Sequence, residues 1–552
     1  MDLRKQSIIN TIILFFLYVF AAALFLRGIG DESLGFPDAD RILMDGVFLR
    51  DVLVDLPFSS PMDYAYNYFA QYPALSIGYR PPFFPGVEAI FNLTFGINMW
   101  SSRLALFLFA IAGITAWYKL VDRLYGSQAA VFSTLLWVST PFVARWGWYT
   151  MGEIPVLSMV LVTAYFFYRF LETSAAKYLY LTAIFLGLSA WTKQTAVFAG
   201  VWFLLVLLVR GELLPVLRRR DTWLASILLA AIIAPLAALT LSFGDQNVYQ
   251  SIGSMPTSGA SRFSIENWLI LIRNLFNYHL TLPFAVLALA GAAASVITKD
   301  RRAIFGVIGV LSVYLFFSLL VGKNARYAIF WIPLFALFAA APLRYLSVHR
   351  LARTAFSALL AGVIVYQTVL VYQQTPAFAK GYKEAAAVAL KNRKGPIVFI
   401  DAYNNGYLTY FFRQQDPNRS TYVLRGDKIL TSASISAKHW LEVHASTYDD
   451  FRKILKQNAV SIIVVEDRDY TGLAPHKAFR EFLKTDQFRL VDTIPITANR
   501  NISILPGSPP LNGRSLLIYE NKAAADQPEG KLILKLPVVG RTIVIDWKKR
   551  KR

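Results

Sequence analysis

The sequence contains no cysteine, so neither a disulfide framework nor a thiolate metal site is available to it. Histidine is also scarce, and none of the five histidines has the spacing of a metal-binding motif such as HExxH. Charged residues make up only 16% of the chain, whereas hydrophobic residues make up 55%. This shortage of charge is far from the composition of a soluble domain. It requires that lipid covers much of the apolar surface.

Long apolar runs are abundant instead. The first, from Ser7 to Leu26, has about the 20 residues needed to cross a bilayer. It is longer than the apolar part of a secretory signal, and no small-x-small cleavage site follows it, so we expect a retained anchor. The runs predict an α-helical polytopic membrane protein with about eleven spans. They lie near residues 7–26, 100–118, 128–144, 154–171, 178–191, 195–209, 222–243, 280–297, 303–321, 327–343 and 354–373.

The charges between the runs predict the orientation. With eleven spans, the basic residues of the short connections fall on one side, which the positive-inside rule makes the cytoplasm. They are Arg4, Lys5, Lys119, Arg123, Lys177, Arg218, Arg219, Arg220, Lys299, Arg301, Arg302, Arg344, Arg350 and Arg353. Topology thereby explains the net charge of +21, and we expect no nucleic-acid partner. We expect a plasma-membrane protein with a cytoplasmic N-terminus and an extracytoplasmic tail.

The chain divides into two expected domains. Residues 1–375 form the membrane domain, with a large first outer loop at 27–99 that reads as amphipathic helices and proline-broken turns. Residues 376–552 form an extracytoplasmic α/β domain. Its predicted strands are 396–402, 460–467 and 515–520, its predicted helices include YKEAAAVALKN and TYDDFRKILKQN, and LILKLPVV and RTIVIDW predict a terminal hairpin. The basic tip WKKRKR is expected to be disordered or to rest on anionic lipid headgroups.

Three acidic residues stand where the chain meets the outer face of the membrane. Asp38 and Asp40 lie in GFPDADRIL, shortly after the first apolar run, and they could equally be part of a solvated loop. Glu153 lies in WGWYTMGEIP, at the outer start of a span. A carboxylate entering an apolar helix is costly unless it faces a cavity or a partner. The alternative is an acid favoured by the helix dipole, with Pro155 in the first turn.

Positive charge is otherwise rare on the outer side. Lys193 interrupts the apolar segment AWTKQTAV, and Lys323 and Arg326 precede another in GKNARYAIFWIP. Such cations suit the binding of phosphate, and an arginine fork suits a diphosphate or phosphodiester oxygen. Their alternative role is to reach toward lipid headgroups.

The order of these segments resembles a known family. PDAD, YPALSIGYRPPFFPGVEAIF, MGEIP, LGLSAWTKQ and KNARYAIFWIPLFAL, spread over roughly residues 1–375, are similar to segments of integral membrane glycosyltransferases of the C-type fold. Within that fold the chain resembles the branch of protein O-mannosyltransferases and lipid A aminoarabinose transferases. The resemblance implies a polyprenyl-phosphate-linked sugar donor, an outward-facing active site, and a first-loop acid that acts as base or metal contact.

The chain departs from the family pattern at three points. The first-loop acid is often followed directly by a second acid, but here Ala39 separates Asp38 from Asp40, so either is the candidate base. Arg80 stands before two prolines where a histidine often begins the motif, and it is itself suited to a phosphate. The segment TKQ replaces TKG but keeps Lys193.

The resemblance therefore assigns roles to named residues. Asp38 or Asp40 deprotonates the acceptor hydroxyl, and Glu153 positions the acceptor or, with Asp38, holds a divalent ion. Expected donor contacts are Arg80, Lys193, Lys323, Arg326 and Tyr327. Expected partners are the lipid-linked donor, membrane lipids and an acceptor that is a lipid, a polysaccharide or a protein. Two alternatives stay open: a transporter or lipid flippase, which predicts inverted repeats and charges near the midplane, and a non-catalytic scaffold.

Overall fold

The computed structural model describes residues 3–33, 35–244, 261–320, 322–433, 441–499, 511–525, 527–528, 531–536 and 541–547. The chain forms two compact units. The first, called here the membrane unit, comprises Met1–Ile29, Ile77–Val87 and Ser102–Pro376. The second, called here the sheet unit, comprises Gly30–Ser76, Glu88–Ser101 and Ala377–Arg552.

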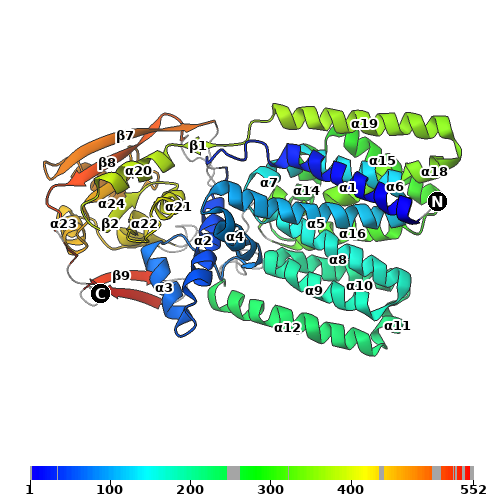
Figure 1. The fold of residues 1–552 in the computed structure, drawn as a ribbon, viewed down its shortest axis with the longest axis horizontal. Coiled ribbons are helices and arrows are strands. Elements are labelled where there is room, and N and C mark those ends of the chain that lie inside the picture. Colours follow the sequence, from blue (N-terminus) through cyan, green and yellow to red (C-terminus); the bar gives the residue numbers. More distant parts are fainter. Residues whose placement is uncertain are drawn as a thin grey trace. The chain divides into compact units, whose positions relative to one another are not determined.

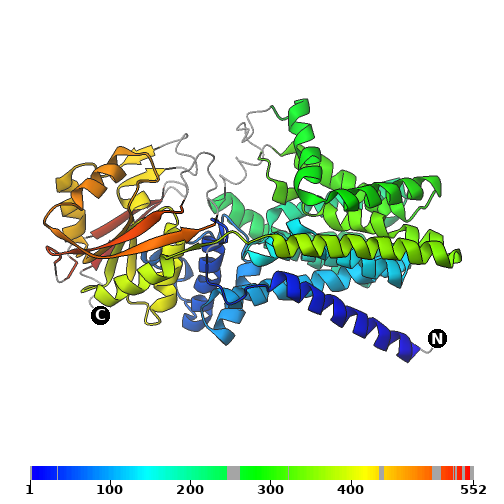
Figure 2. The ribbon, with the colours of Figure 1, turned by 90° about the horizontal axis from the view of Figure 1, so that it is seen from above.

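The membrane unit is built from helices, and its long helices run in roughly the same direction in both views of the ribbon (Figures 1 and 2). Its elements are α1 (Leu3–Phe25), α5 (Met99–Tyr125), α6 (Ser127–Ser139), α7 (Pro141–Trp148), α8 (Glu153–Thr173), α9 (Ala176–Thr192), η1 (Gln194–Val197), α10 (Phe198–Val209), α11 (Leu213–Leu217), α12 (Arg220–Phe243), α14 (Ile265–Asn274), η2 (Leu275–His279), α15 (Leu282–Ile297), α16 (Ala303–Leu319), η3 (Ala325–Ala328), α17 (Trp331–Ala340), α18 (Pro342–Tyr345), η4 (Leu346–Val348) and α19 (Arg350–Gln373). The helix α4 (Phe83–Phe95) begins in this unit and ends in the sheet unit, whereas α5 begins in the sheet unit and continues in this one from Ser102.

Each of the eleven predicted apolar runs falls on helical structure, which confirms a helical polytopic membrane protein. Six helices of the described chain are long and apolar enough to cross a membrane, and four further apolar helices are shorter, so the count of eleven spans stays a prediction. The predicted span near 128–144 is divided between two helices. Pro141 lacks an N–H group and disfavours helical geometry at Thr140, so α6 ends at Ser139 and α7 begins anew.

Close contact between α15 and α17 depends on a glycine. A methyl group added at Gly291 would lie 1.9 Å from the carbonyl oxygen of Phe338, and a backbone atom cannot move aside cheaply. We expect Gly291→Ala to destabilise the membrane unit by about 1–3 kcal/mol through overpacking. Thermal inactivation in detergent measures this. Gly362→Ala is the control, because Gly362 lies within helix α19 with no neighbouring atom in reach of the added methyl, and it should leave stability unchanged or higher.

The sheet unit contains a six-stranded mixed sheet in the order β1-β7-β8-β6-β2-β3. Strand β2 (Ile397–Asp401), next to the edge strand, pairs in parallel with β3 (Tyr422–Arg425) and β6 (Ile462–Glu466). The other pairings are antiparallel, and β7 and β8 form the long orange and red pair in Figure 2. The remaining elements of the unit are α2 (Ala39–Asp55), α3 (Pro61–Gln71), β1 (Ala379–Lys380), α20 (Tyr382–Asn392), α21 (Asn405–Gln415), α22 (Gly426–Ile429), β4 (Thr431–Ala433), β5 (Leu441–Val443), α23 (Tyr448–Gln457), α24 (Ala474–Phe482), β7 (Phe488–Ala498), β8 (Arg514–Asn521), β9 (Lys531–Leu536) and β10 (Arg541–Asp546).

The predicted elements of this tail are confirmed. The three predicted strands are β2, β6 and β8, the two helical segments are α20 and α23, and β9 and β10 form the antiparallel hairpin. The basic tip lies at its end, where residues 548–552 are outside the described residues. The long strand β7 was not predicted. It contains Pro495, which normally argues against a strand, but β1 pairs only with Ala498 and Thr497, so the missing N–H of Pro495 breaks no bond to that strand.

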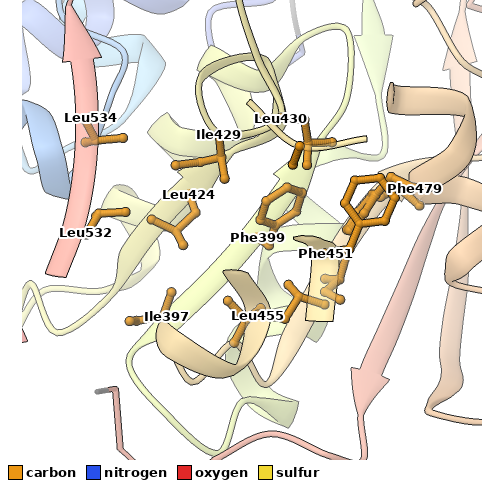
Figure 3. Close-up of a cluster of buried hydrophobic side chains, with 14 of the residues drawn as sticks. Ile397, Phe399, Leu424, Ile429, Leu430, Phe451, Leu455, Phe479, Leu532 and Leu534 are labelled. Carbon is orange, nitrogen blue, oxygen red and sulfur yellow. The ribbon is translucent and has the colours of Figure 1, made fainter. Parts of the chain in front are cut away.

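Most of the predicted first outer loop, Gly30–Ser76 and Glu88–Ser101, groups with the sheet unit, whereas Ile77–Val87 groups with the membrane unit. Ala70 of α3 is fully buried in the apolar core of this unit, and Tyr66 and Phe69 pack against it. Figure 3 shows part of this core, in which side chains from β2, β3, α22, α23, α24 and β9 converge. Helix α3 of the loop therefore completes this apolar core.

Candidate functional site

Glu153 is the first residue of α8 and of a candidate membrane span, and its side chain is only 1% exposed. Gly152 precedes it as the N-cap residue. The partial positive charge of the helix N-terminus favours a carboxylate here. Burial, however, removes water from that carboxylate, so it needs further positive charge nearby.

Two cations from distant parts of the chain supply that charge. Lys193 Nζ lies 2.7 Å from Glu153 Oε1, and Arg326 Nε lies 3.5 Å from the same oxygen. Lys193 stands at the break between α9 and η1, where an extended backbone interrupts the helix, and Arg326 lies in the short helix η3. The charge of Arg80 also acts on Glu153. We call these four residues the Glu153 cluster.

Aromatic rings flank the cations of the Glu153 cluster. The ring centre of Tyr327 lies 5.4 Å from Lys193 Nζ and 5.6 Å from Arg326 Cζ, and Arg326 also lies 5.9 Å from the ring centre of Trp146. These distances are within the range of cation–π attraction. Lys193 and Arg326 keep 23% and 14% of their side-chain surface exposed. Three cations and one carboxylate leave this partly accessible cluster with a net charge of +2.

Lys323 has a different environment. Its ammonium group donates hydrogen bonds to the carbonyl oxygens of Phe317, Ser318 and Leu320, at 2.5 to 2.6 Å. An ammonium has three donors, so these bonds cap the C-terminal end of α16. Burial, together with the charge of Arg262, lowers the pKa of Lys323 to about 8. The lysine fixes the loop that leads to Arg326.

The two first-loop acids lie at the start of α2, in the sheet unit. Asp38 is the N-cap residue of α2 and is partly exposed, whereas Asp40 is only 7% exposed. The carboxylate of Asp40 lies against Gly406, in the first turn of α21, where an added methyl group would be 1.8 Å from Oδ2. The charge of Asp40 also acts on Arg425, the last residue of β3. Asp40 therefore lies near the carboxyl end of β3, a parallel strand, and open α/β sheets commonly bind ligands at such ends.

Comparison with known proteins identifies the fold. Residues 79–238 match the family model described as dolichyl-phosphate-mannose-protein mannosyltransferase, a segment that includes Arg80, Glu153 and Lys193. The structure is similar to ArnT from Cupriavidus metallidurans bound to undecaprenyl phosphate, with a TM-score of 0.59 and 14% identity over 94% of this chain and 98% of that one. The chain has the C-type fold of membrane glycosyltransferases.

A second structure with the C-type fold also matches. The Archaeoglobus fulgidus oligosaccharyltransferase in the apo form gives a TM-score of 0.52 and 13% identity, over 82% of this chain and 69% of that one. No curated protein shows significant sequence similarity to the chain. The resemblance predicted from the sequence is thus confirmed, at the level of the C-type fold.

A divalent ion does not fit Glu153. Its Oε1 already contacts two cations, and Oε2 is buried with no hydrogen-bond partner among the described residues. A metal ion would have to share this carboxylate with Lys193 and Arg326, which repel it. In the described part of the chain, no group of three or more histidine, aspartate or glutamate side chains is arranged to hold a metal. We therefore assign no metal ion to this cluster of the C-type fold.

Two residues near the candidate site were not predicted from the sequence. Gly406 provides the space that the Asp40 carboxylate fills, and His279 contacts the backbone beside Arg326. Neither position carries a local signal, because a glycine in a helix and a lone histidine at a helix end have many possible roles. Only the folded structure brings them to the candidate site residues.

Proposed function

We propose that the protein transfers a sugar from a polyprenyl-phosphate-linked donor to an acceptor at the extracytoplasmic face of the membrane. The observation that carries this proposal is the Glu153 cluster, a preorganised group of cations at the first residue of a candidate span. A lipid-linked donor keeps its polyprenyl chain in the bilayer, so its phosphate must be bound near the membrane boundary. The C-type fold and the matched family segment support the same reaction class.

Arg326 and Lys193 hold the phosphate of the donor in this proposal. The bond between the sugar and the phosphate breaks as the acceptor oxygen attacks, and negative charge grows on the departing phosphate. Fixed cations that need no reorganisation stabilise that charge most effectively. Glu153 keeps the two cations close together before the donor arrives, and its negative charge offsets part of their mutual repulsion. Arg80 adds a further positive charge, and the ring of Tyr327 lies within cation–π distance of Lys193.

Asp38 is the acceptor base in this proposal. A base must approach within hydrogen-bond reach of the hydroxyl that it deprotonates, and Asp38 is partly exposed at the N-cap of α2. Asp40 is buried against Gly406, so we assign it to holding the first turn of α2 in place. The proton passes from the acceptor hydroxyl to Asp38, and the sugar passes from the phosphate to the acceptor oxygen.

The orientation and the partners follow from the same assignment. The protein lies in the plasma membrane in this proposal. The basic short connections favour a cytoplasmic N-terminus and an extracytoplasmic first loop. The acceptor is a lipid, a polysaccharide or a protein that reaches the extracytoplasmic surface.

The test uses the full chain in nanodiscs with a panel of radiolabelled polyprenyl-phosphate sugars and membrane extract as the source of acceptors. One donor should lose its label to an acceptor. Asp38→Asn should lower kcat by about 10²–10⁴-fold, as expected for the loss of a general base, and Asp40→Asn should lower it less. Arg326→Gln and Lys193→Gln should each raise KM for the donor by about tenfold or more, as expected for a lost charged hydrogen bond.

Arg301→Gln is the matched control, since Arg301 is exposed and lies on the predicted cytoplasmic side. It should leave both constants unchanged. If no donor of the panel is bound or consumed by the wild-type protein, the proposed reaction is wrong. If Asp40→Asn is the more damaging first-loop change, the assignment of the base passes from Asp38 to Asp40.

A further inference from the structure

The segment that carries Arg326 is held by a buried histidine. His279 ends the π-helix η2 and has no exposed surface. Its Nε2 lies 2.8 Å from the carbonyl oxygen of Ala325, the residue before Arg326. Its Nδ1 lies 2.9 Å from the indole Nε1 of Trp331, the first residue of α17. The imidazole thus joins three elements of the membrane unit, η2, η3 and α17.

The protonation state of this imidazole follows from its partners. An indole N–H can only donate, so Nδ1 must accept and carries no hydrogen. A neutral imidazole then has its hydrogen on Nε2, and that hydrogen is donated to the carbonyl of Ala325. Burial lowers the pKa of His279 to about 4, because the bond to Ala325 offsets only part of the desolvation. The ring is therefore neutral at physiological pH.

Two further contacts restrain the same loop. The Asn324 side chain accepts a hydrogen bond of 3.1 Å from the backbone N–H of Arg326, and Lys323 fixes the start of the loop to α16. His279 is the restraint on the carbonyl directly before Arg326. Without it, this peptide keeps the bond from its N–H to Asn324 but loses the tie from its carbonyl to η2, so η3 and the guanidinium that it carries are less firmly placed. A misplacement of about 1 Å can cost about 10²-fold in rate.

We propose that His279 is a positioning residue, whose Nε2–H···O=C bond to Ala325 sets the guanidinium of Arg326 for the phosphate of a polyprenyl-phosphate donor. The inference rests on the proposed function, because it gives Arg326 that ligand. The imidazole itself touches neither donor nor acceptor in this role. It acts through the backbone of η3.

A pair of variants separates hydrogen bonding from packing. His279→Phe keeps an aromatic ring against Phe142, whose ring centre lies 4.5 Å from that of His279, but it removes the donor to Ala325. His279→Gln loses the ring but can place an amide N–H close to the position of Nε2. A ring needed only for packing is better replaced by phenylalanine, whereas a positioning donor is better replaced by glutamine.

The experiment measures the full chain in nanodiscs with undecaprenyl phosphate as the binding probe, and hydrogen exchange of peptides covering residues 322–330. His279→Phe should weaken probe binding by about tenfold or more and should accelerate exchange in this segment. His279→Gln should restore both values to within a few-fold of the wild type. In transfer assays His279→Phe should raise KM for the donor more than it lowers kcat. On an Arg326→Gln background, His279→Phe should add little further loss of binding.

The remaining outcomes overturn the inference. It is wrong if His279→Phe leaves exchange and binding unchanged, or if His279→Gln is as damaging as His279→Phe. It is also wrong if exchange rises while binding stays the same, because η3 would then be loosened with no effect on the phosphate site. If Arg326→Gln itself leaves probe binding unchanged, the proposed phosphate site is wrong, and so is the role of His279 in it. Faster exchange in His279→Phe would then show only that His279 holds η3 in place.

Discussion

Replacing Asp51 by asparagine should destabilise the sheet unit by about 3–5 kcal/mol, because it removes one partner of a buried ion pair. Asp51 in α2 and Arg413 in α21 are 0% and 1% exposed, and Arg413 donates to both oxygens of Asp51 at 2.8 to 3.0 Å. Tyr68 donates a further hydrogen bond to Asp51. Burial opposes the charge of Arg413, yet Tyr68 and Asp51 hold its pKa above the ordinary value. Without the carboxylate, a guanidinium remains buried with no counter-charge at this position.

Hydrogen exchange in the full chain measures this loss. Amides of strand β6, which lies inside the sheet between β8 and β2, should exchange about 10²–10⁴-fold faster in Asp51→Asn, as the opening free energy falls. Asp55→Asn is the matched control, since it breaks the more exposed pair of Asp55 with Arg419, one turn further along α2. Such partly exposed pairs contribute about 0–1 kcal/mol, so exchange should change by less than tenfold. Equal effects of the two changes would contradict a stabilising role for the buried pair.

Gly406→Ala should lower sugar transfer by about 10–100-fold while the sheet unit stays folded. The added methyl group would lie 1.8 Å from Oδ2 and 2.6 Å from Cγ of Asp40, so the carboxylate must move by an ångström or more. Asp40 lies in the first turn of α2, two residues after the proposed base Asp38, and its movement shifts that turn. Alanine suits a helix better than glycine, which limits the cost in stability. The effect should appear in kcat, with donor binding unchanged.

A double-variant cycle shows whether this effect passes through Asp40. On an Asp40→Ala background, which removes the clashing carboxylate, Gly406→Ala should cost little more. Gly395→Ala is the control in the same unit, because its added methyl group would make only an ordinary contact of 3.7 Å with the carbonyl oxygen of Ala459. If Gly406→Ala is equally harmful with and without the Asp40 carboxylate, the glycine serves the fold of α21 rather than the first-loop acids.

Local patterns were sufficient for much of the fold. Apolar runs of spanning length predicted the membrane helices, and segments rich in β-branched residues predicted β2, β6 and β8. Such local patterns do not predict which segments pack together in each of the two units. Asp51 and Arg413 are 362 residues apart, and nothing in either segment marks the other as its partner. For that reason the sequence gives no sign that Gly30–Ser76 packs with the tail.

In the candidate site, too, the sequence predicts which residues matter but not which residues contact each other. Charged residues at the ends of apolar runs stand out, so Glu153, Lys193 and Arg326 were all predicted as site residues, and the structure brings them together. Lys323 stands out equally in the sequence, but its ammonium caps a helix. A lone lysine beside an apolar run is expected to lie at the membrane boundary. The group that its ammonium binds depends on how the neighbouring helix ends fold.

The sharing of one core between the first loop and the tail has a consequence for biosynthesis. The segment around α3 leaves the ribosome early, but the strands and helices that bury Ala70 are made hundreds of residues later. At typical synthesis rates of 5–20 residues per second, the 362 residues between Asp51 and Arg413 take roughly 20–70 s. During that interval the apolar face of α3 lacks its partners. We expect the loop to rest on the membrane surface or on a chaperone until the tail arrives, so truncation of the tail should leave the loop open to proteolysis.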